Sequence, residues 1–301
     1  MPPLALGLVL VAAVIHASWN LLAKQAGGDM RFALLLQAGV AVLWAPVGLW
    51  FAWQEAPEYG VLQWGLLGAS GALHMVYFVT LLRGYRLGDL SVVYPLARGT
   101  GPLLTAVVAS SLLGEALSWV GGLGVLGVVL GIFLVAGGPV AWRQLRSGGG
   151  VLADRTRLRS GVSYGLLTGV FIAAYTVVDG YAVKRAGISP VSVDYLGNVV
   201  RLPLTVLWFW GVQQQGAPPL RDYWRGRYKS ALVIAAISPV SYVLVLYAVR
   251  LAPLSHVAPA REVSMLVAAL FGGALLRERD AGMRLLGAAC IAGGVIALSL
   301  A

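Results

Sequence analysis

The feature that most constrains this chain is a series of ten apolar segments, each about 20 residues long. They cover residues 4–24, 31–53, 61–82, 90–113, 118–138, 160–182, 190–213, 228–249, 254–276 and 282–301. The hydrocarbon core of a bilayer requires about 20 apolar residues per helix, and the backbone polar groups inside it must be hydrogen-bonded within the segment. We therefore predict an all-α integral membrane protein with ten transmembrane helices.

The composition agrees with this prediction, because 59% of the residues are hydrophobic and only 11% are charged. Soluble domains carry about 25% charged residues. The net charge of +10 does not indicate a nucleic-acid partner, since the basic residues cluster in short gaps between the apolar segments. The sequence has no nucleotide-binding loop, metal motif or soluble module, so we expect a non-enzyme without cofactor. Its expected partners are the lipid bilayer, a small-molecule solute and protons.

The two halves of the chain resemble each other around a basic segment at residues 139–159. Residues 85–95 match residues 249–259 at a shift of 164, and residues 24–27 match residues 184–187 at a shift of 160. Each half holds five apolar segments, and an odd number requires the second half to be inverted in the membrane. We therefore predict a 5+5 inverted repeat, with residues 1–138 and 160–301 joined by the basic loop 139–159. Such repeats place the solute between the halves near the bilayer midplane.

The basic residues also predict an orientation. The gaps after the odd-numbered segments hold 16 of the 22 Lys and Arg residues, and the gaps after the even-numbered segments hold three. Since cytoplasmic loops are enriched in Lys and Arg, we predict a multi-pass protein of the cell (inner) membrane with both termini outside the cytoplasm.

Three stretches carry a resemblance to a known family. They are residues 16–24 (HASWNLLAK), the stretch from Gly101-Pro102 through Leu113-Gly114-Glu115, and Leu276-Arg277-Glu278. In these the sequence resembles the ten-helix, EamA-like members of the drug/metabolite transporter superfamily. The resemblance implies a carrier, and many such carriers export amino acids, metabolites or cationic drugs. These carriers are usually described with both termini in the cytoplasm, and here the charges indicate the opposite.

Five charged residues lie well within apolar segments, where an ionised side chain requires a partner, a wet cavity or a function. They are Arg98, Asp179, Arg201, Arg261 and Glu262. One interpretation is that the arginines bind an anionic group of the solute through the planar guanidinium. The alternative is internal ion pairing, of Arg98 or Arg261 with Glu262 and of Arg201 with Asp179. Three arginines against two acids favour a carboxylate, phosphonate or phosphate on the solute.

Other polar side chains extend the candidate site. Asp194, Asn198, Arg201 and Thr205 share one helical stripe, which lines a path or bonds to a neighbouring helix. With the arginines, the candidate substrate-binding residues are His16, Trp19, Asn20, His74, Tyr77, Tyr94, Tyr175 and Asn198. Packing between helices is the alternative for the aromatic residues. The candidate proton-coupling residues are Asp179, Glu262 and His256, because each can take up and release a proton.

The glycine-rich segment 118–138 favours close helix packing, with Gly127 and Gly131 at the small-xxx-small spacing. It predicts a scaffold or an oligomer contact, in a monomer or a homodimer. Glu115 and Glu278 precede this segment and segment 282–301, so we expect each to stabilise the N-terminus of the helix that follows it.

The leading prediction is a secondary transporter that exports a small polar metabolite, amino-acid-like or an organic anion, by proton-coupled alternating access. Two alternatives stay open. One is an uncoupled facilitator or exchanger, and the other is an intramembrane enzyme or flippase for lipid-linked substrates.

Overall fold

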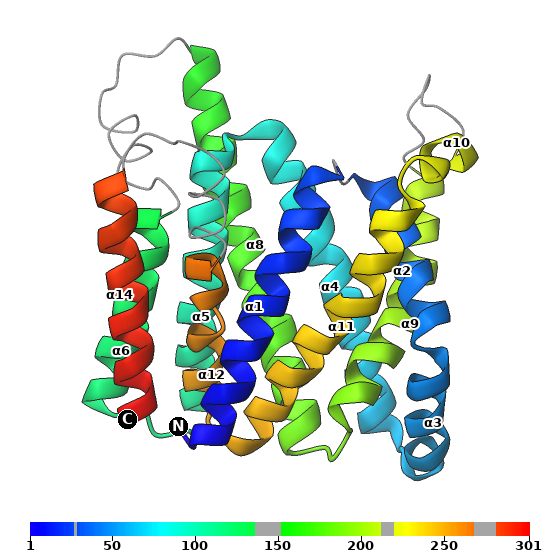
Figure 1. Ribbon diagram of the computed structural model, residues 1–301, viewed down its shortest axis with the longest axis horizontal. Helices are drawn as coiled ribbons and strands as arrows, with labels where there is room; N and C mark the ends of the chain where they lie inside the picture. Colours follow the sequence, from blue (N-terminus) through cyan, green and yellow to red (C-terminus); the bar gives the residue numbers. More distant parts are fainter. Residues whose placement is uncertain (27–28, 136–151, 212–219, 268–280) are drawn as a thin grey trace.

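The computed structural model describes residues 1–26, 29–135, 152–211, 220–267 and 281–301, which form helices and no strands. In chain order the helices are α1 (Pro3–Gln25), α2 (Met30–Leu43), α3 (Ala45–Glu55), η1 (Ala56–Glu58), α4 (Val61–Leu87), α5 (Leu90–Leu112), α6 (Trp119–Val135), α8 (Leu152–Lys184), α9 (Pro190–Gly211), α10 (Leu220–Arg225), α11 (Tyr228–Leu251), α12 (Leu254–Ala260) and α14 (Ala281–Leu300). The predicted all-α class is confirmed for these residues (Figure 1).

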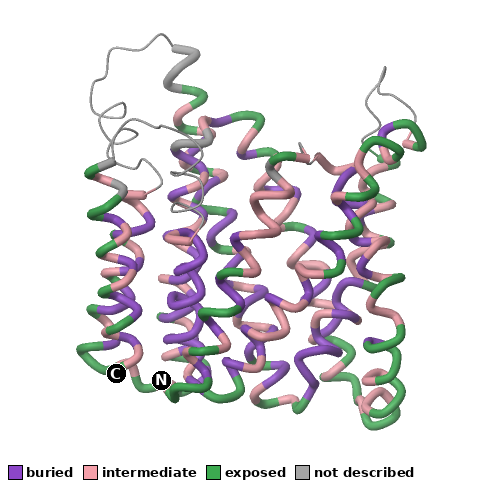
Figure 2. The backbone as a smooth tube through the Cα atoms, viewed as in Figure 1, coloured by how far each residue is buried: buried purple, intermediate pink, exposed green. Residues whose placement is uncertain are grey.

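Five of the described helices are long and apolar enough to cross a membrane, and the number is six if α2 and α3 form one bent span. Residues 119–135 and 285–300 form shorter apolar helices. Large apolar side chains such as Leu126 and Leu207 are more than half exposed, as a lipid-facing surface requires. Many exposed residues lie along the outer helices of the bundle (Figure 2). The protein is therefore a multi-pass membrane protein, and the number of ten spans stays a prediction.

One predicted segment is not a continuous helix. Segment 31–53 is divided at Trp44 into α2 and α3, and the two axes are bent by 64°. Pro46 explains the break, because it has no N–H to donate to the carbonyl of Val42 and its ring crowds that carbonyl. The indole of Trp44 donates to the carbonyl oxygen of Ala235 at 3.1 Å, which ties the bend to α11.

Prolines act differently in the two matched segments. Pro95 removes one backbone hydrogen-bond donor, but α5 continues through it. α12 ends one residue after Pro259, and the turn that follows contains Arg261 and Glu262. Hydrogen bonds that span three residues instead of four mark this turn. Glu262 N–H donates to the carbonyl oxygen of Pro259 at 3.0 Å and Met265 N–H to that of Glu262 at 2.9 Å. Two buried charges thus lie where regular helix hydrogen bonding is interrupted.

The repeat seen in the sequence recurs in the backbone. Gly88, between α4 and α5, has φ −127° and ψ 175°. Ala252, between α11 and α12, has φ −141° and ψ 162°. The same extended break therefore separates equivalent helices in both halves.

The halves are packed together through α1 against α11 and through α4 and α5 against α8. α6 and α14 form a pair at one edge of the bundle, and both chain termini lie at the same end (Figure 1). The glycines of α6 permit this pairing, since a Cβ at Gly131 would lie 2.5 Å from the carbonyl oxygen of Gly287 and one at Gly124 2.8 Å from that of Gly294. The close-packing role predicted for α6 is thus confirmed within one chain.

Candidate functional site

The buried charges gather between the two halves, where α5 of the first half faces the turn after α12 of the second. Glu262 is 1% exposed and Arg261 7%. Glu262 Oε1 lies 3.5 Å from Arg98 Nη1 and 3.7 Å from Arg261 Nε. We call these three residues the arginine cluster. Its two positive charges share one carboxylate, so the cluster carries a net positive charge at a site of low dielectric constant.

His16 of α1 completes this side of the site. Arg98 Nη2 lies 3.3 Å from His16 Nε2. Since a guanidinium only donates, the imidazole nitrogen must accept, which leaves the neutral ring with its proton on Nδ1. The His16 ring also lies edge-on to Trp19, with centroids 4.8 Å apart, and the Arg98 guanidinium lies 5.9 Å from the ring centroid of Tyr94. Two sequence-predicted residues, His16 and Tyr94, therefore lie beside Arg98, and Trp19 packs against His16.

A second group, the His74–Asp179 cluster, joins α4, α8 and α11. Asp179 is fully buried, and its Oδ2 accepts a short hydrogen bond from the Tyr242 hydroxyl and lies 4.0 Å from His74 Nε2. His74 Nδ1 lies 2.9 Å from the carbonyl oxygen of Ser70, so Nδ1 carries a proton and Nε2 faces the carboxylate. The imidazole stacks on Tyr175 with centroids 3.9 Å apart, and Tyr77 meets Tyr175 edge-on at 5.5 Å.

Arg201 anchors a third group on α9. Arg201 Nη2 donates to Asn198 Oδ1 at 2.9 Å, and Asn198 Nδ2 donates to the carbonyl oxygen of Gln37 at 3.1 Å. Thr205 Oγ1 donates to Gln37 Oε1 at 2.9 Å. The polar stripe of α9 therefore bonds to α2, which supports the interhelical alternative for Asn198 and Thr205.

The predicted ion pairs are formed only in part. Glu262 pairs with both Arg98 and Arg261. Within the described part of the chain, Arg201 makes no ion pair with Asp179 or any other carboxylate, because Asn198 takes its place as the hydrogen-bond acceptor. Electrostatic interactions still connect Asp179 with Arg201 and Arg261, so the groups belong to one charged region.

Several buried polar atoms in this region have unused hydrogen-bonding capacity. Among the described residues, Asp179 Oδ1, Arg201 Nε and Glu262 Oε2 have no hydrogen-bond partner. Native proteins leave few such atoms, and each one requires an explanation. Two acceptors and one donor are thus available to a polar molecule.

Two predicted residues lie outside this arrangement. Asn20 Nδ2 donates to the carbonyl oxygen of His16 at 2.7 Å, a bond within α1. His256 is 3% exposed, and neither ring nitrogen has a hydrogen-bond partner in the residues that the structure describes. Its ring lies against α6, where a Cβ at Gly121 would be 3.3 Å from Nε2. His256 therefore faces α6, and none of its described contacts is with a residue of either cluster.

Tyr242 and Gln37 belong to the site but were not predicted from the sequence. Tyr242 follows Pro239 and Ser241 in an otherwise apolar segment, and Trp19 Nε1 donates to Ser241 Oγ at 3.3 Å. Polar residues beside an intramembrane proline were the available signal for Tyr242. Gln37 is a single amide in an apolar segment, and only the fold shows that it faces α9.

Glu115 lies apart from the clusters, at the end of the bundle that holds the termini. Gly114 precedes it with φ +66°, a conformation that favours glycine, and turns the chain after α5. Glu115 Oε1 accepts from Lys184 Nζ at 2.7 Å and from Leu254 N–H at 2.8 Å, and Oε2 accepts from Ser255 N–H at 2.8 Å. Burial raises the pKa of Glu115, but these hydrogen bonds outweigh it and hold the pKa below its ordinary value of 4.5.

The predicted role of Glu115 at the helix that follows it is therefore wrong. Its carboxylate binds the start of α12, because the turn at Gly114 directs it across to the second half. Glu55, at the end of α3, makes a similar connection, with Oε2 accepting from Ser192 Oγ at 2.9 Å and from Ser189 N–H at 3.2 Å. Glu278 lies outside the described residues.

Comparison with known proteins agrees with the fold. A solved structure described only as "Crystal structure of protein" is 17% identical to this chain, with a TM-score of 0.71 over 98% of this chain and 96% of that one. At this identity the likeness shows the fold alone. The comparison with curated proteins gave no match. The model of the EamA-like transporter family matches twice, at residues 3–137 and 159–300. This two-repeat match covers most of the chain, which therefore belongs to the EamA-like transporter family and is a membrane transporter of the drug/metabolite superfamily.

Proposed function

We propose that this protein is a secondary carrier that exports a small zwitterionic, amino-acid-like or anionic metabolite by alternating access, in exchange for protons. The observation that carries the proposal is the arginine cluster. Arg98 of the first half and Arg261 of the second share the single carboxylate of Glu262. A solute carboxylate that binds between them neutralises the excess positive charge in a region where charge is costly.

The unpartnered atoms suggest how a zwitterion would be oriented. Its carboxylate would bind the arginine cluster or Arg201 Nε, and its ammonium would bind Asp179 Oδ1. The rings of His74, Tyr175 and Tyr77 lie beside Asp179 and can contact a cation through their faces. A purely anionic solute would use the arginines alone.

Asp179 also supplies a route to proton coupling. A buried carboxylate can hold a proton or an ammonium group, but not both at once. His74 Nε2 faces the same carboxylate and can pass the proton from Asp179 toward the open side of the site before the solute binds. Competition at one carboxylate would couple outward movement of the solute to inward movement of a proton, since each carrier state binds only one of them.

The Glu115 network is the proposed closure at the end that holds the termini. Glu115 of the first half binds Lys184 and the start of α12, both of the second half. If the halves move apart at this end during transport, the hydrogen bonds must break. The charge distribution favours an orientation with this end outside the cytoplasm. In that orientation the network would close the outward side while the site loads from the cytoplasm.

A thermal-stability screen of the purified protein tests the solute class. Amino acids, organic acids, phosphonates and cationic drugs are compared on the parent, on Arg98→Gln and on Arg225→Gln, which removes an arginine whose side chain is 65% exposed. A ligand that binds the folded state raises the unfolding midpoint with its concentration. We expect zwitterions or anions to stabilise the parent and Arg225→Gln, and Arg98→Gln to require at least about 30-fold more ligand. Stabilisation by cations alone would refute the arginine site.

A further inference from the structure

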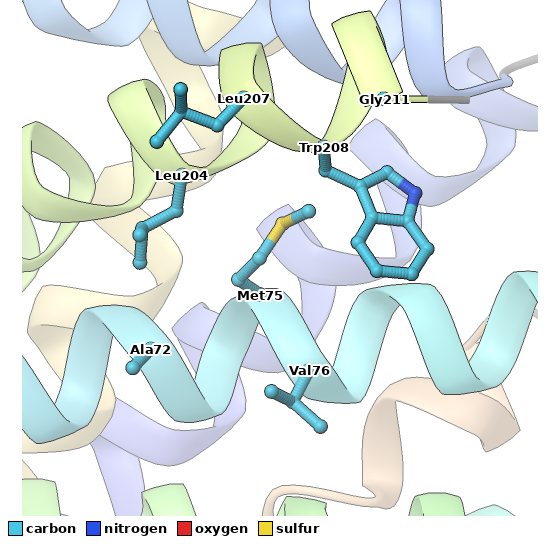
Figure 3. A pocket seen from close by; sticks show the side chains of 7 residues that line it. All are labelled: Ala72, Met75, Val76, Leu204, Leu207, Trp208 and Gly211. Carbon is cyan, nitrogen blue, oxygen red and sulfur yellow. The ribbon is translucent and has the colours of Figure 1, made fainter. Parts of the chain in front are cut away.

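An apolar groove runs along the outside of the bundle between α4 and α9. We call it the α4–α9 groove; its lining residues are Ala72, Met75, Val76, Leu204, Leu207, Trp208 and Gly211. Met75 projects from α4 toward α9, and Trp208 lies at the end of the groove nearest Gly211 (Figure 3). Val76 is 41% exposed and Leu207 64%. None of these seven residues belongs to the buried clusters between the halves.

A positive charge is fixed at one end of this groove. The Arg83 guanidinium lies 5.1 Å from the ring centroid of Trp208. Ala72, Val76 and Arg83 are separated by four and seven residues, so they share one stripe of α4. At 1.5 Å per residue, Arg83 lies about 16 Å along the helix from Ala72. The stripe thus leads from an apolar channel to a cation near the end of α4, and exposed Arg86 follows three residues later.

The Arg83 guanidinium keeps its hydrogen-bonding capacity in this position. Contact with the face of an indole uses the positive charge of the guanidinium and none of its N–H donors, which lie in its own plane. Those donors match the oxygens of a phosphate in number and geometry. The groove therefore offers apolar walls for a chain and a phosphate-binding group at its mouth.

We propose that the α4–α9 groove is a binding site for an anionic phospholipid, with one acyl chain in the groove and the headgroup phosphate on Arg83. The charge of the site selects the lipid class, because a zwitterionic phosphatidylcholine headgroup offers a trimethylammonium group that Arg83 and Arg86 repel. This end of α4 lies opposite the termini (Figure 1). Anionic lipids attract basic residues near the membrane surface, and the attraction of each residue corresponds to about a fivefold gain in binding.

Quenching of Trp208 fluorescence by brominated lipid tests the proposal on the full chain in nanodiscs. Dibrominated phosphatidylglycerol or dibrominated phosphatidylcholine is titrated into an unbrominated phosphatidylcholine matrix. The chain has 10 tryptophans, so the Trp208 signal is the difference between each protein and the same protein carrying Trp208→Phe. We expect half-maximal quenching of Trp208 at an about three- to tenfold lower fraction of phosphatidylglycerol than of phosphatidylcholine.

Three variants locate the interaction. Arg83→Gln should remove the preference for phosphatidylglycerol, while Arg221→Gln, an exposed arginine on α10, should leave it unchanged. Gly211→Leu should reduce quenching by both lipids, since Gly211 lines the groove and a Cβ there meets no described atom within 4 Å, so that we expect the added side chain to occupy the groove. Equal quenching by the two lipids in the parent, a preference that survives Arg83→Gln, or full quenching in Gly211→Leu would each overturn the proposal.

Discussion

Replacing Glu115 by glutamine should lower the stability of the protein by an amount that the structure allows us to estimate. The side chain is 8% exposed and accepts from three donors, one of them the charged Lys184. Glutamine keeps the shape but turns one acceptor into a donor. The loss of the charge-assisted bond costs about 1.5–3 kcal/mol, and a buried N–H left without an acceptor costs about 1–3 kcal/mol. Lys184 is 21% exposed and can bind water instead, so we expect a total of about 2–4 kcal/mol.

Thermal unfolding of the purified protein in detergent at pH 7 measures this loss. For a chain of this size, 1 kcal/mol corresponds to about 2–4 °C, so the midpoint of Glu115→Gln should fall by roughly 5–12 °C. Glu58→Gln is the matched control, because Glu58 is an exposed carboxylate that follows α3 in the same half. It should change stability by less than about 0.5 kcal/mol. A midpoint of Glu115→Gln within about 2 °C of the parent, which is the largest change expected of the control, would refute the reasoning.

The same pair of proteins gives a pH dependence with a defined sign. The pKa of Glu115 in the folded protein lies below its ordinary value of 4.5. A carboxyl group of this kind stabilises the fold fully above its unfolded pKa, and the contribution disappears as the pH falls through the folded pKa. The difference in midpoint between parent and Glu115→Gln should therefore be constant above about pH 5 and shrink below about pH 4.5. A difference that stays constant down to pH 3.5 would show that the charge of Glu115 does not contribute.

Three further predictions concern packing and coupling. Gly131→Val should destabilise the protein by at least about 1–3 kcal/mol in thermal unfolding, because its Cβ would lie 2.5 Å from the carbonyl oxygen of Gly287. Gly122→Ala should be nearly neutral, because its Cβ has no atom within 4 Å. Asp179→Asn should abolish stimulation of transport by a pH gradient in proteoliposomes, and unchanged stimulation would exclude Asp179 as the coupling group. Tyr242→Phe removes the hydroxyl that donates to Asp179 and should shift the pH dependence of transport, measured as flux between about pH 5 and 8. Gel filtration should show little loss of folded protein.

The sequence was sufficient to predict the helical class and the two repeats, and it identified the charged residues that the fold gathers between the halves. Apolar length and the positions of charges determine these features, and both are local properties of the chain. The pairing of Arg98 and Arg261 with Glu262 was also predictable, because the two arginines occupy matched positions in the two halves and Glu262 follows Arg261 directly in the sequence.

Other features depend on how the halves meet, and the sequence does not contain that information in local form. Pairing of Arg201 with Asp179 was one of the alternatives drawn from the sequence, but Arg201 donates instead to Asn198 on its own helix. Glu115 was assigned to the helix that follows it, and the turn at Gly114 directs it instead to α12. Tyr242 shows its role only once α11 lies against α8.

Counterflow in proteoliposomes tests the central claim most directly. Vesicles loaded with an unlabelled zwitterionic or anionic solute that stabilises the parent are diluted into the labelled solute, and its initial uptake is measured for the parent, Arg98→Gln and Arg225→Gln. We predict rapid uptake by the parent and Arg225→Gln, and at least about tenfold slower uptake by Arg98→Gln, because a buried charge-assisted contact contributes more than 1.4 kcal/mol to binding. Equal uptake by Arg98→Gln and the parent would contradict an arginine-centred transport site.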